Sequence, residues 1–198
     1  MTNERISAFS DGVIAILITI MVLELKVPLG TDFAALSPLL PVFLTYVLSF
    51  IVLSIYWNNH HHMFYLTDRI TGGILWANLH LLFWLSLMPF VTGWMGENHF
   101  APLPTALYGV VLMMAGVAYY VLSQAIIRSQ GTHSKLKAAV GNDAKGIISV
   151  ILYLIAIPLA FVNQLLSDAI YVFVALMWLV PDRRIEKRFE EISGEGKS

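Results

Sequence analysis

The sequence predicts an all-α integral membrane protein with six transmembrane helices in each subunit. Hydrophobic residues make up 58% of the 198 residues and charged residues only 13%, and the mean hydropathy is +0.73. Soluble domains carry roughly 45–50% apolar and about 25% charged residues, and one soluble core of this length could not bury so much apolar side chain. The formal net charge of −1 gives no basic field for nucleic acid. The absence of cysteine excludes disulfides, thiolate metal sites and cysteine nucleophiles.

Six segments are apolar enough to cross a bilayer, which takes about 20 residues. They run over residues 5–27, 38–64, 70–95, 105–127, 146–163 and 167–180. Asp11 interrupts the first segment and no clean cleavage site follows, so we expect a retained helix rather than a signal peptide. Pro89 and Pro158 are expected to kink the third and fifth segments. Only one polar break separates the last two segments, so a five-span or re-entrant arrangement stays open.

Basic residues in the loops predict the orientation of the chain. If both termini lie on the side of the loops after the second and fourth segments, that side carries eleven of the 12 basic residues. They are Arg5, Arg69, Arg128, Lys135, Lys137, Lys145, Arg183, Arg184, Lys187, Arg188 and Lys197, against Lys26 alone on the other side. Because cytoplasmic loops are enriched in Lys and Arg, both termini are expected to be cytoplasmic. The opposite side carries acids that either attract cations or only reflect topology, namely Glu24, Asp32, Glu97 and Asp168.

The chain is predicted to form one membrane domain. Residues 1–181 make the six-helix unit, and residues 182–198 form a short charged cytoplasmic tail of mixed sign. The longest polar stretch inside the domain is the loop over residues 129–145.

The first segment carries polar groups that a lipid-facing helix would not, so we expect it to be buried in an assembly. At about 100° per residue, one stripe along this helix combines apolar and small polar residues. It contains Arg5, Phe9, Gly12, Ile16, Thr19 and Leu23, with Ile20 beside it. Steps of three and four residues are typical of a helix that packs against copies of itself or other helices. A packing seam without ion conduction stays open. Asp11 points away from Ile16, so we expect it to tether the helix to its neighbours.

The second and third segments offer partners for these polar groups. The second ends in Trp57-Asn58-Asn59-His60-His61-His62, and the third contains Asn78 and His80. Consecutive helical residues point 100° apart, whereas helical zinc sites use i, i+4 spacing, so we expect no metal site at the histidines. We expect one or two histidines to bond Ser10, Asp11 or Asn78. Because no catalytic motif accompanies them, an enzyme is not predicted.

The start of the first segment resembles the signature of a known family. Arg5, Phe9, Ser10 and Asp11 form Arg-x-x-x-Phe-Ser-Asp, followed by Gly-Val-Ile-Ala-Ile. This is similar to the signature of the transmembrane protein 175 family of potassium channels. Trp57, His60 and Phe64 at the end of the second segment, and Asn78 in the third, also resemble that family. The resemblance covers essentially the whole chain.

The resemblance implies a potassium-preferring cation channel in a prokaryotic plasma membrane. It implies a homotetramer whose pore is lined by the first helix and narrowed by isoleucine or leucine rings. Ile16 would form the narrowest ring, Thr19 would favour potassium, and Leu23 or Ile20 would form a further ring. Potassium would pass near Ile16 and Thr19, and no resident cofactor or metal is expected.

The resemblance also implies a polar network that anchors the first helix to the second and third. Its members would be Arg5, Ser10, Asp11, His60 and Asn78. Two other function classes stay open: a proton-coupled transporter that uses Asp11 and His60, and a membrane scaffold that conducts nothing. The expected partners are further copies of the chain, the lipid bilayer and monovalent cations.

Overall fold

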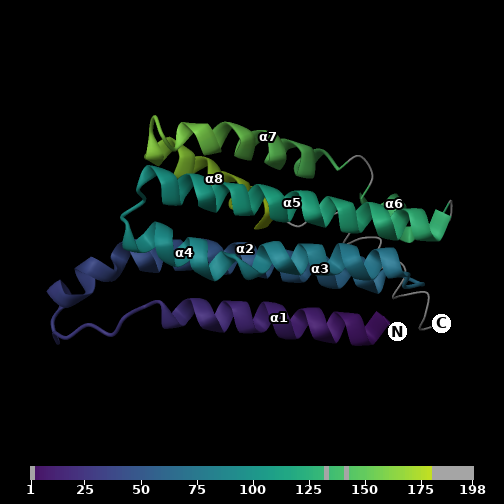
Figure 1. Cartoon of the computed structure of the whole chain (residues 1–198), viewed down its shortest axis with the longest axis horizontal. Helices are drawn as coiled ribbons and strands as arrows, with labels where there is room; N and C mark the ends of the chain where they lie inside the picture. Colours follow the sequence, from purple (N-terminus) through teal and green to yellow (C-terminus); the bar gives the residue numbers. More distant parts are fainter. Residues whose placement is uncertain (1–2, 132–133, 141–142, 180–198) are drawn as a thin grey trace.

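The computed structural model describes residues 3–131, 134–140 and 143–179. All regular structure within these residues is helical, which confirms the predicted all-α class. The elements are α1 (Asn3–Leu23), η1 (Phe33–Leu39), α2 (Leu40–Tyr65), α3 (Gly72–Ser86), α4 (Met88–Glu97), α5 (Pro102–Gln130), α6 (Lys135–Val140), α7 (Ala144–Leu159) and α8 (Gln164–Leu179). The long helices lie side by side along the longest axis of the molecule (Figure 1).

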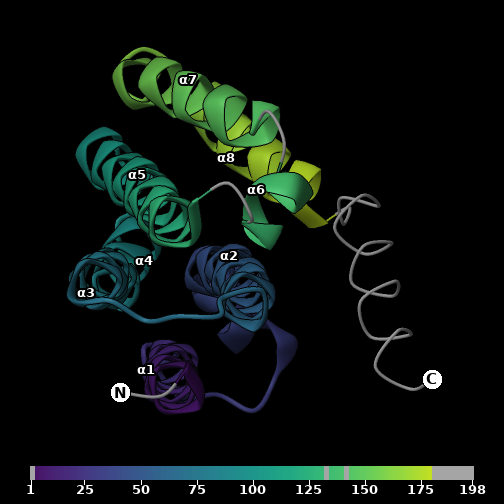
Figure 2. The same ribbon diagram turned by 90° about the vertical axis from the view of Figure 1, so that its right-hand side faces the viewer.

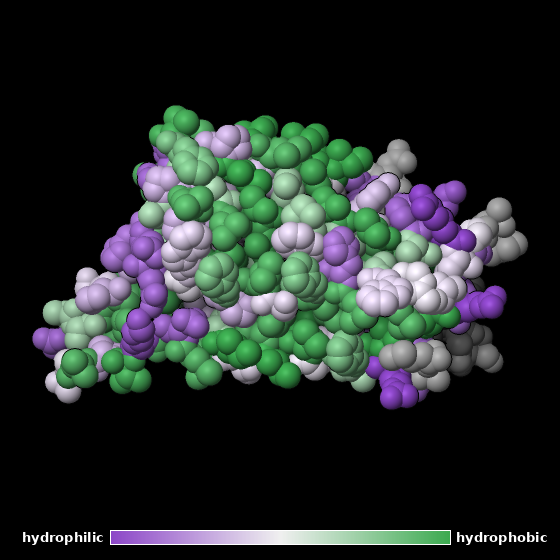
Figure 3. All heavy atoms as spheres, viewed as in Figure 1, coloured by the Kyte–Doolittle hydropathy of each residue, from purple (hydrophilic) through white to green (hydrophobic). Residues whose placement is uncertain are grey.

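Four helical stretches within the described residues are long and apolar enough to cross a membrane. They are residues 3–23, 33–65, 72–97 and 102–130. The remaining apolar helices, α7 and α8, have only 16 residues each. Hydrophobic side chains gather over the middle of the molecule and hydrophilic ones mostly over its two ends (Figure 3). The chain therefore has the surface of a multi-pass membrane protein.

Capping residues and prolines move several helix boundaries away from the predicted ones. The third predicted segment is two helices, because α3 ends at Ser86 and α4 begins at Met88, with Pro89 in its first turn. Proline lacks the N–H that a continuous helix would need there. The last helix begins at Gln164, three residues before its predicted start, because the side chain of Asn163 accepts a hydrogen bond from the backbone N–H of Leu166. The predicted loop over residues 129–145 contains α6.

The helices pack around α2 and α5, with α1 on one side of the bundle and α7 and α8 on the other (Figure 2). Close approaches depend on glycine. A Cβ atom at Gly109 of α5 would overlap the hydroxyl oxygen of Tyr171 of α8. A Cβ atom at Gly96 of α4 would lie 2.7 Å from the Cα atom of Val42 of α2. These glycines let neighbouring helices approach more closely than any larger residue would allow.

Contacts at each end of the bundle show which segments lie together there. At one end, Lys26 forms an ion pair with Glu97 at 2.6 Å. At the other, the side-chain amide of Asn3 donates to the carbonyl oxygen of Phe64 at 2.6 Å. There too Lys135 Nζ lies 3.1 Å from an oxygen of Asp68. Segments that were predicted to share one side therefore meet at one end. The predicted tail, residues 182–198, and its five basic residues lie outside the described residues.

Candidate functional site

Helix α1 has one face inside the bundle and one face outside it. The buried face consists of Ile6, Ser10, Ile14, Leu17 and Met21. The exposed residues include the whole predicted stripe, namely Arg5, Phe9, Gly12, Ile16, Thr19, Ile20 and Leu23. Ile14 is 1% exposed, whereas Ile16 is 57% and Leu23 77% exposed. The predicted stripe is thus the face of α1 that its own chain leaves uncovered.

Thr19 is the hydroxyl-bearing member of this exposed face of α1. Its hydroxyl donates a hydrogen bond to the carbonyl oxygen of Ile16, 2.9 Å away in the preceding turn of the helix. The hydroxyl hydrogen is therefore used within the helix, and the oxygen lone pairs remain available on the exposed face. A hydroxyl oxygen in this state is suited to contact a cation.

A buried chain of hydrogen bonds joins the other face of α1 to α3 and α2. The amide nitrogen of Asn78 donates to Ser10 Oγ at 3.0 Å. The amide oxygen of Asn78 accepts from Nε2 of His60 at 2.8 Å. All three side chains are buried, and the His60 ring also stacks on Phe64 with centroids 4.5 Å apart. One asparagine thus links three helices through both ends of its amide.

Asp11 makes a separate tether to α2. The indole N–H of Trp57 donates to a carboxylate oxygen of Asp11 at 2.9 Å. Arg5 and Phe9 lie on the exposed face and contribute no hydrogen bond to this tether or to the chain through Asn78. Arg5 precedes Ser10 by five residues, so the two side chains point about 140° apart around the helix. Arg5 therefore points away from the buried chain of hydrogen bonds. The structure therefore joins Ser10, His60 and Asn78 directly, and Asp11 to Trp57.

The three consecutive histidines point in different directions. His60 is buried, His61 is exposed and His62 is intermediate. Across the described ranges no group of three or more His, Cys, Asp or Glu side chains is arranged to hold a metal ion. Sequence reasoning missed one pair on α3, in which Trp84 donates its indole N–H to His80 at 3.0 Å. Their i, i+4 spacing was the available signal.

Two of the acids at the Lys26 end of the bundle already have structural partners. Glu97 pairs with Lys26, and its carboxylate raises the pKa of Lys26 above the usual value. The side chain of Asp32 accepts from the backbone N–H of Ala35 at 3.0 Å and so caps η1. These contacts account for the position of both acids without a bound cation.

Sequence and structure comparisons agree with one another. The family described as "Endosomal/lysosomal potassium channel TMEM175" matches residues 5–89, which contain α1, α2 and α3. A potassium channel of Chryseobacterium sp. (strain P1-3) is 54% identical over 191 residues, covering 96% of this chain and 100% of that protein. A potassium channel of Streptomyces collinus (strain DSM 40733 / Tue 365) is 29% identical over 187 residues, covering 89% and 91%. The crystal structure of a lysosomal potassium-selective channel TMEM175 homolog from Chamaesiphon minutus matches with a TM-score of 0.74 at 26% identity, covering 90% of this chain and 96% of that one.

Proposed function

Because the chain belongs to the TMEM175 family of potassium channels, we propose that it conducts potassium through a pore lined by copies of α1. The exposed face of α1 is the observation that carries this proposal. Ile16, Thr19 and Leu23 lie on that face, while the opposite face is held by buried hydrogen bonds. A helix that is bonded to its own subunit on one face and uncovered on the other is suited to face the symmetry axis of an assembly.

The proposed assembly is a homotetramer in the plasma membrane, with α1 nearest its centre. Each subunit spans the membrane six times and has both termini in the cytoplasm, which the distribution of basic residues supports. Helices α7 and α8 are each about 24 Å long at 1.5 Å per residue, so they cross a core of about 30 Å with help from flanking interfacial groups. Residues 1–181 form this unit, and residues 182–198 are its cytoplasmic tail.

The proposed gate is apolar. A ring of Ile16 side chains offers an ion no ligand, so a narrow ring dewets and blocks conduction, whereas a wider ring admits a partly hydrated ion. Leu23, with Ile20 as the alternative, forms a second ring. Thr19 lies between these rings in sequence and offers its hydroxyl oxygen to potassium. No bound cofactor takes part.

The direct test is ion flux from liposomes that contain the purified protein, with the Ile16→Asn variant beside the natural chain. An amide in the narrowest ring keeps water there, so the variant should conduct potassium faster than the natural protein. Ile155→Asn is the matched control, because Ile155 is 51% exposed on α7, away from α1. If Ile16→Asn changes the flux no more than Ile155→Asn does, Ile16 is not the gate.

Selectivity is tested separately at Thr19. Thr19→Val keeps the shape of the side chain but removes its oxygen, so the ratio of potassium to sodium flux should fall. Thr45→Val is the matched control, since the Thr45 hydroxyl also donates to a carbonyl one turn earlier, 2.9 Å away, but is buried in the bundle. An unchanged ratio in Thr19→Val would remove Thr19 from the selectivity mechanism.

A proton-coupled transporter is the alternative, with Asp11 and His60 as the proton relay. Asp11 is bonded to Trp57 and His60 to Asn78, and these bonds give each group a structural role instead. The same liposomes separate the two functions. Ohmic potassium flux supports the channel, and saturable counterflow driven by a pH gradient supports the transporter.

A further inference from the structure

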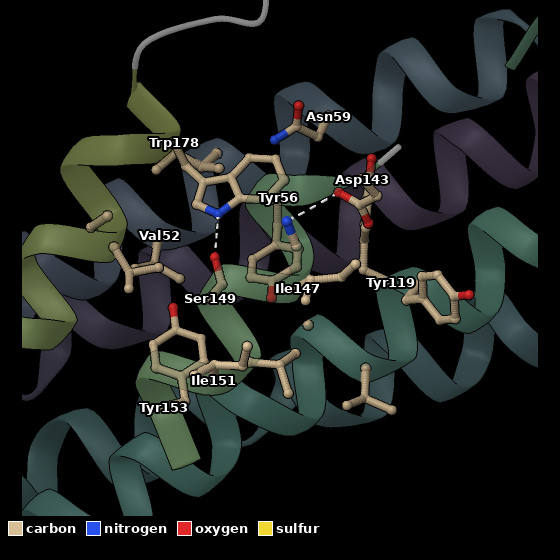
Figure 4. A pocket seen from close by; sticks show the side chains of 18 residues that line it. Val52, Tyr56, Asn59, Tyr119, Asp143, Ile147, Ser149, Ile151, Tyr153 and Trp178 are labelled. Atoms are coloured by element: carbon tan, nitrogen blue, oxygen red, sulfur yellow. Dashed lines mark hydrogen bonds between the residues drawn. The ribbon is translucent and has the colours of Figure 1, made fainter. Parts of the chain in front are cut away.

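A cavity of about 290 Å³ lies between α2, α5, α7 and α8, away from α1 (Figure 4). Most of its wall is apolar or aromatic, including Val52, Ile151 and Tyr153. Ligand sites in proteins have volumes of roughly 300–1,000 Å³, so this cavity is at the lower limit of that range. It fits one slender apolar group.

Polar groups gather at one end of this cavity. Asn59 stands near the end of α2, Asp143 caps α7 and Trp178 lies near the end of α8. In Figure 4 these three side chains lie on one side, and Tyr153 lies on the other. Val52 precedes Asn59 by seven residues, which places it about 10 Å further along α2. The cavity therefore runs from a polar rim at the end of the bundle that carries the N-terminus into the apolar interior.

Trp178 forms a fixed wall at the polar rim. Its indole N–H donates to Ser149 Oγ at 2.9 Å, and Lys145 Nζ lies 6.0 Å from the centre of its ring. A bonded tryptophan beside a lysine is typical of the level where lipid headgroups meet hydrocarbon. Asp143 on the same rim carries the charge opposite to that of Lys145, so the formal charges of these two residues cancel.

The cavity opens on the surface that faces lipid. Three of its lining residues are strongly exposed, with Tyr120 on α5 at 49%, Ile147 at 60% and Ile151 at 51% on α7. Ile148, Leu154 and Ile155 extend this exposed apolar surface along α7. Helix α7 lies on the side of the bundle opposite to α1 (Figure 2). If α1 faces the pore, α7 meets bilayer hydrocarbon.

We propose that this cavity holds one acyl chain of a bilayer phospholipid, with the headgroup at the rim formed by Asn59, Asp143 and Trp178. The chain enters between α5 and α7 and fills the apolar interior. The inference depends on the proposed central position of α1 for its orientation, but not on ion conduction. A bound chain joins α7 and α8 to α2 and α5, and so supports the packing of the two shortest apolar helices.

Gly116→Leu is the variant that fills the cavity. A Cβ atom at Gly116 would have the Tyr56 hydroxyl, at 3.8 Å, as its nearest neighbour, so a larger side chain has room to enter. Gly73→Leu is the matched control, because a Cβ atom at Gly73 on α3 would also have its nearest neighbour at 3.8 Å, outside the cavity. Ile147→Trp, which closes the mouth from an exposed position, is the second variant if Gly116→Leu does not fold.

The experiment measures retention of dioleoylphosphatidylcholine by the detergent-purified full chain, using native mass spectrometry. The natural chain and Gly73→Leu should each retain one lipid per subunit, and Gly116→Leu or Ile147→Trp should lose most of it. Equal retention in all variants would overturn the proposal.

A second measurement locates the bound chain. The probe is phosphatidylcholine brominated near the carboxyl end of its acyl chain, close to the level of Trp178, and the readout is the part of the tryptophan fluorescence quenching that is lost in Trp178→Phe. This Trp178-dependent quenching should be present in the natural chain and absent in Gly116→Leu, and its absence from the natural chain would overturn the proposal.

Potassium flux is measured on the same preparations. Normal flux without retained lipid contradicts only the lipid site, whereas retained lipid without flux in any variant contradicts only the proposed channel.

Discussion

Asn78 connects α1 to two neighbouring helices. Its amide donates to Ser10 of α1 and accepts from His60 of α2, and all three groups are buried. In a membrane interior no water replaces a lost partner, so each unsatisfied polar group costs free energy. An apolar residue at position 78 would leave both partners without their bonds.

We therefore expect Asn78→Leu to lower the free energy of unfolding by about 1–3 kcal/mol. Thermal unfolding of the detergent-purified protein measures the change. Asn58→Leu is the control, because Asn58 is an exposed asparagine of α2. Equal unfolding temperatures for the two variants would contradict the role given to Asn78.

The sequence predicts directions on a helix better than it predicts partners. The stripe that contains Ile16 and Leu23 followed from a rotation of 100° per residue, and these residues do share one exposed face. For His60 the same reasoning left Ser10, Asp11 and Asn78 as equal options. Asn78 is the partner of His60 because α3 packs against both α1 and α2. The packing of three helices cannot be read from the direction of side chains on one of them.

Helix positions depend on glycines at contacts as much as on apolar faces. At Gly109, α5 approaches Tyr171 of α8 so closely that a methyl group would collide with the tyrosine hydroxyl. This hydroxyl also donates to the carbonyl oxygen of Thr105 at 3.2 Å, which holds the ring in place. The contact fixes α8 against α5.

Gly109→Ala should therefore destabilise the bundle by about 1–3 kcal/mol, the usual cost of adding atoms to a packed core. Gly116→Ala, on the same helix with an open neighbourhood, is the control and should leave stability nearly unchanged. Thermal unfolding compares the two. If Gly109→Ala is as stable as the control, α5 and α8 can move apart to admit a methyl group without loss of unfolding free energy, which would contradict the role given to this contact.

The apolar runs in the sequence predict that the helices exist, but they do not predict the residues at which the helices begin and end. Four of the predicted spans correspond to helices that are long and apolar enough to cross a membrane. The division at Pro89 appeared in the sequence only as an expected kink, because a proline does not reveal whether a helix bends or restarts. The start of α8 depends on a cap by Asn163, and a polar break in the sequence does not show which of its residues caps the next helix.

At the scale of the whole molecule, the uncovered face of α1 is the feature that a single subunit does not explain. Polar tethers on one face hold α1 against α2 and α3, and the other face presents Ile16, Thr19 and Leu23 outward. Among the described residues, Lys26 lies at the Glu97 end of the bundle, and Lys135 lies at the other end beside Asp68. In the proposed homotetramer, this face is the pore wall.

Chemical modification at Leu23 tests this central claim most directly. The chain has no cysteine, so Leu23→Cys introduces a single thiol, on a residue that is 77% exposed near the end of α1. If α1 lines the pore, a positively charged, water-soluble thiol reagent should sharply reduce potassium flux from liposomes that contain this variant. The same reagent should leave Ile155→Cys, on α7, unaffected. Complete modification of Leu23→Cys, verified by mass, with unchanged potassium flux would contradict the account.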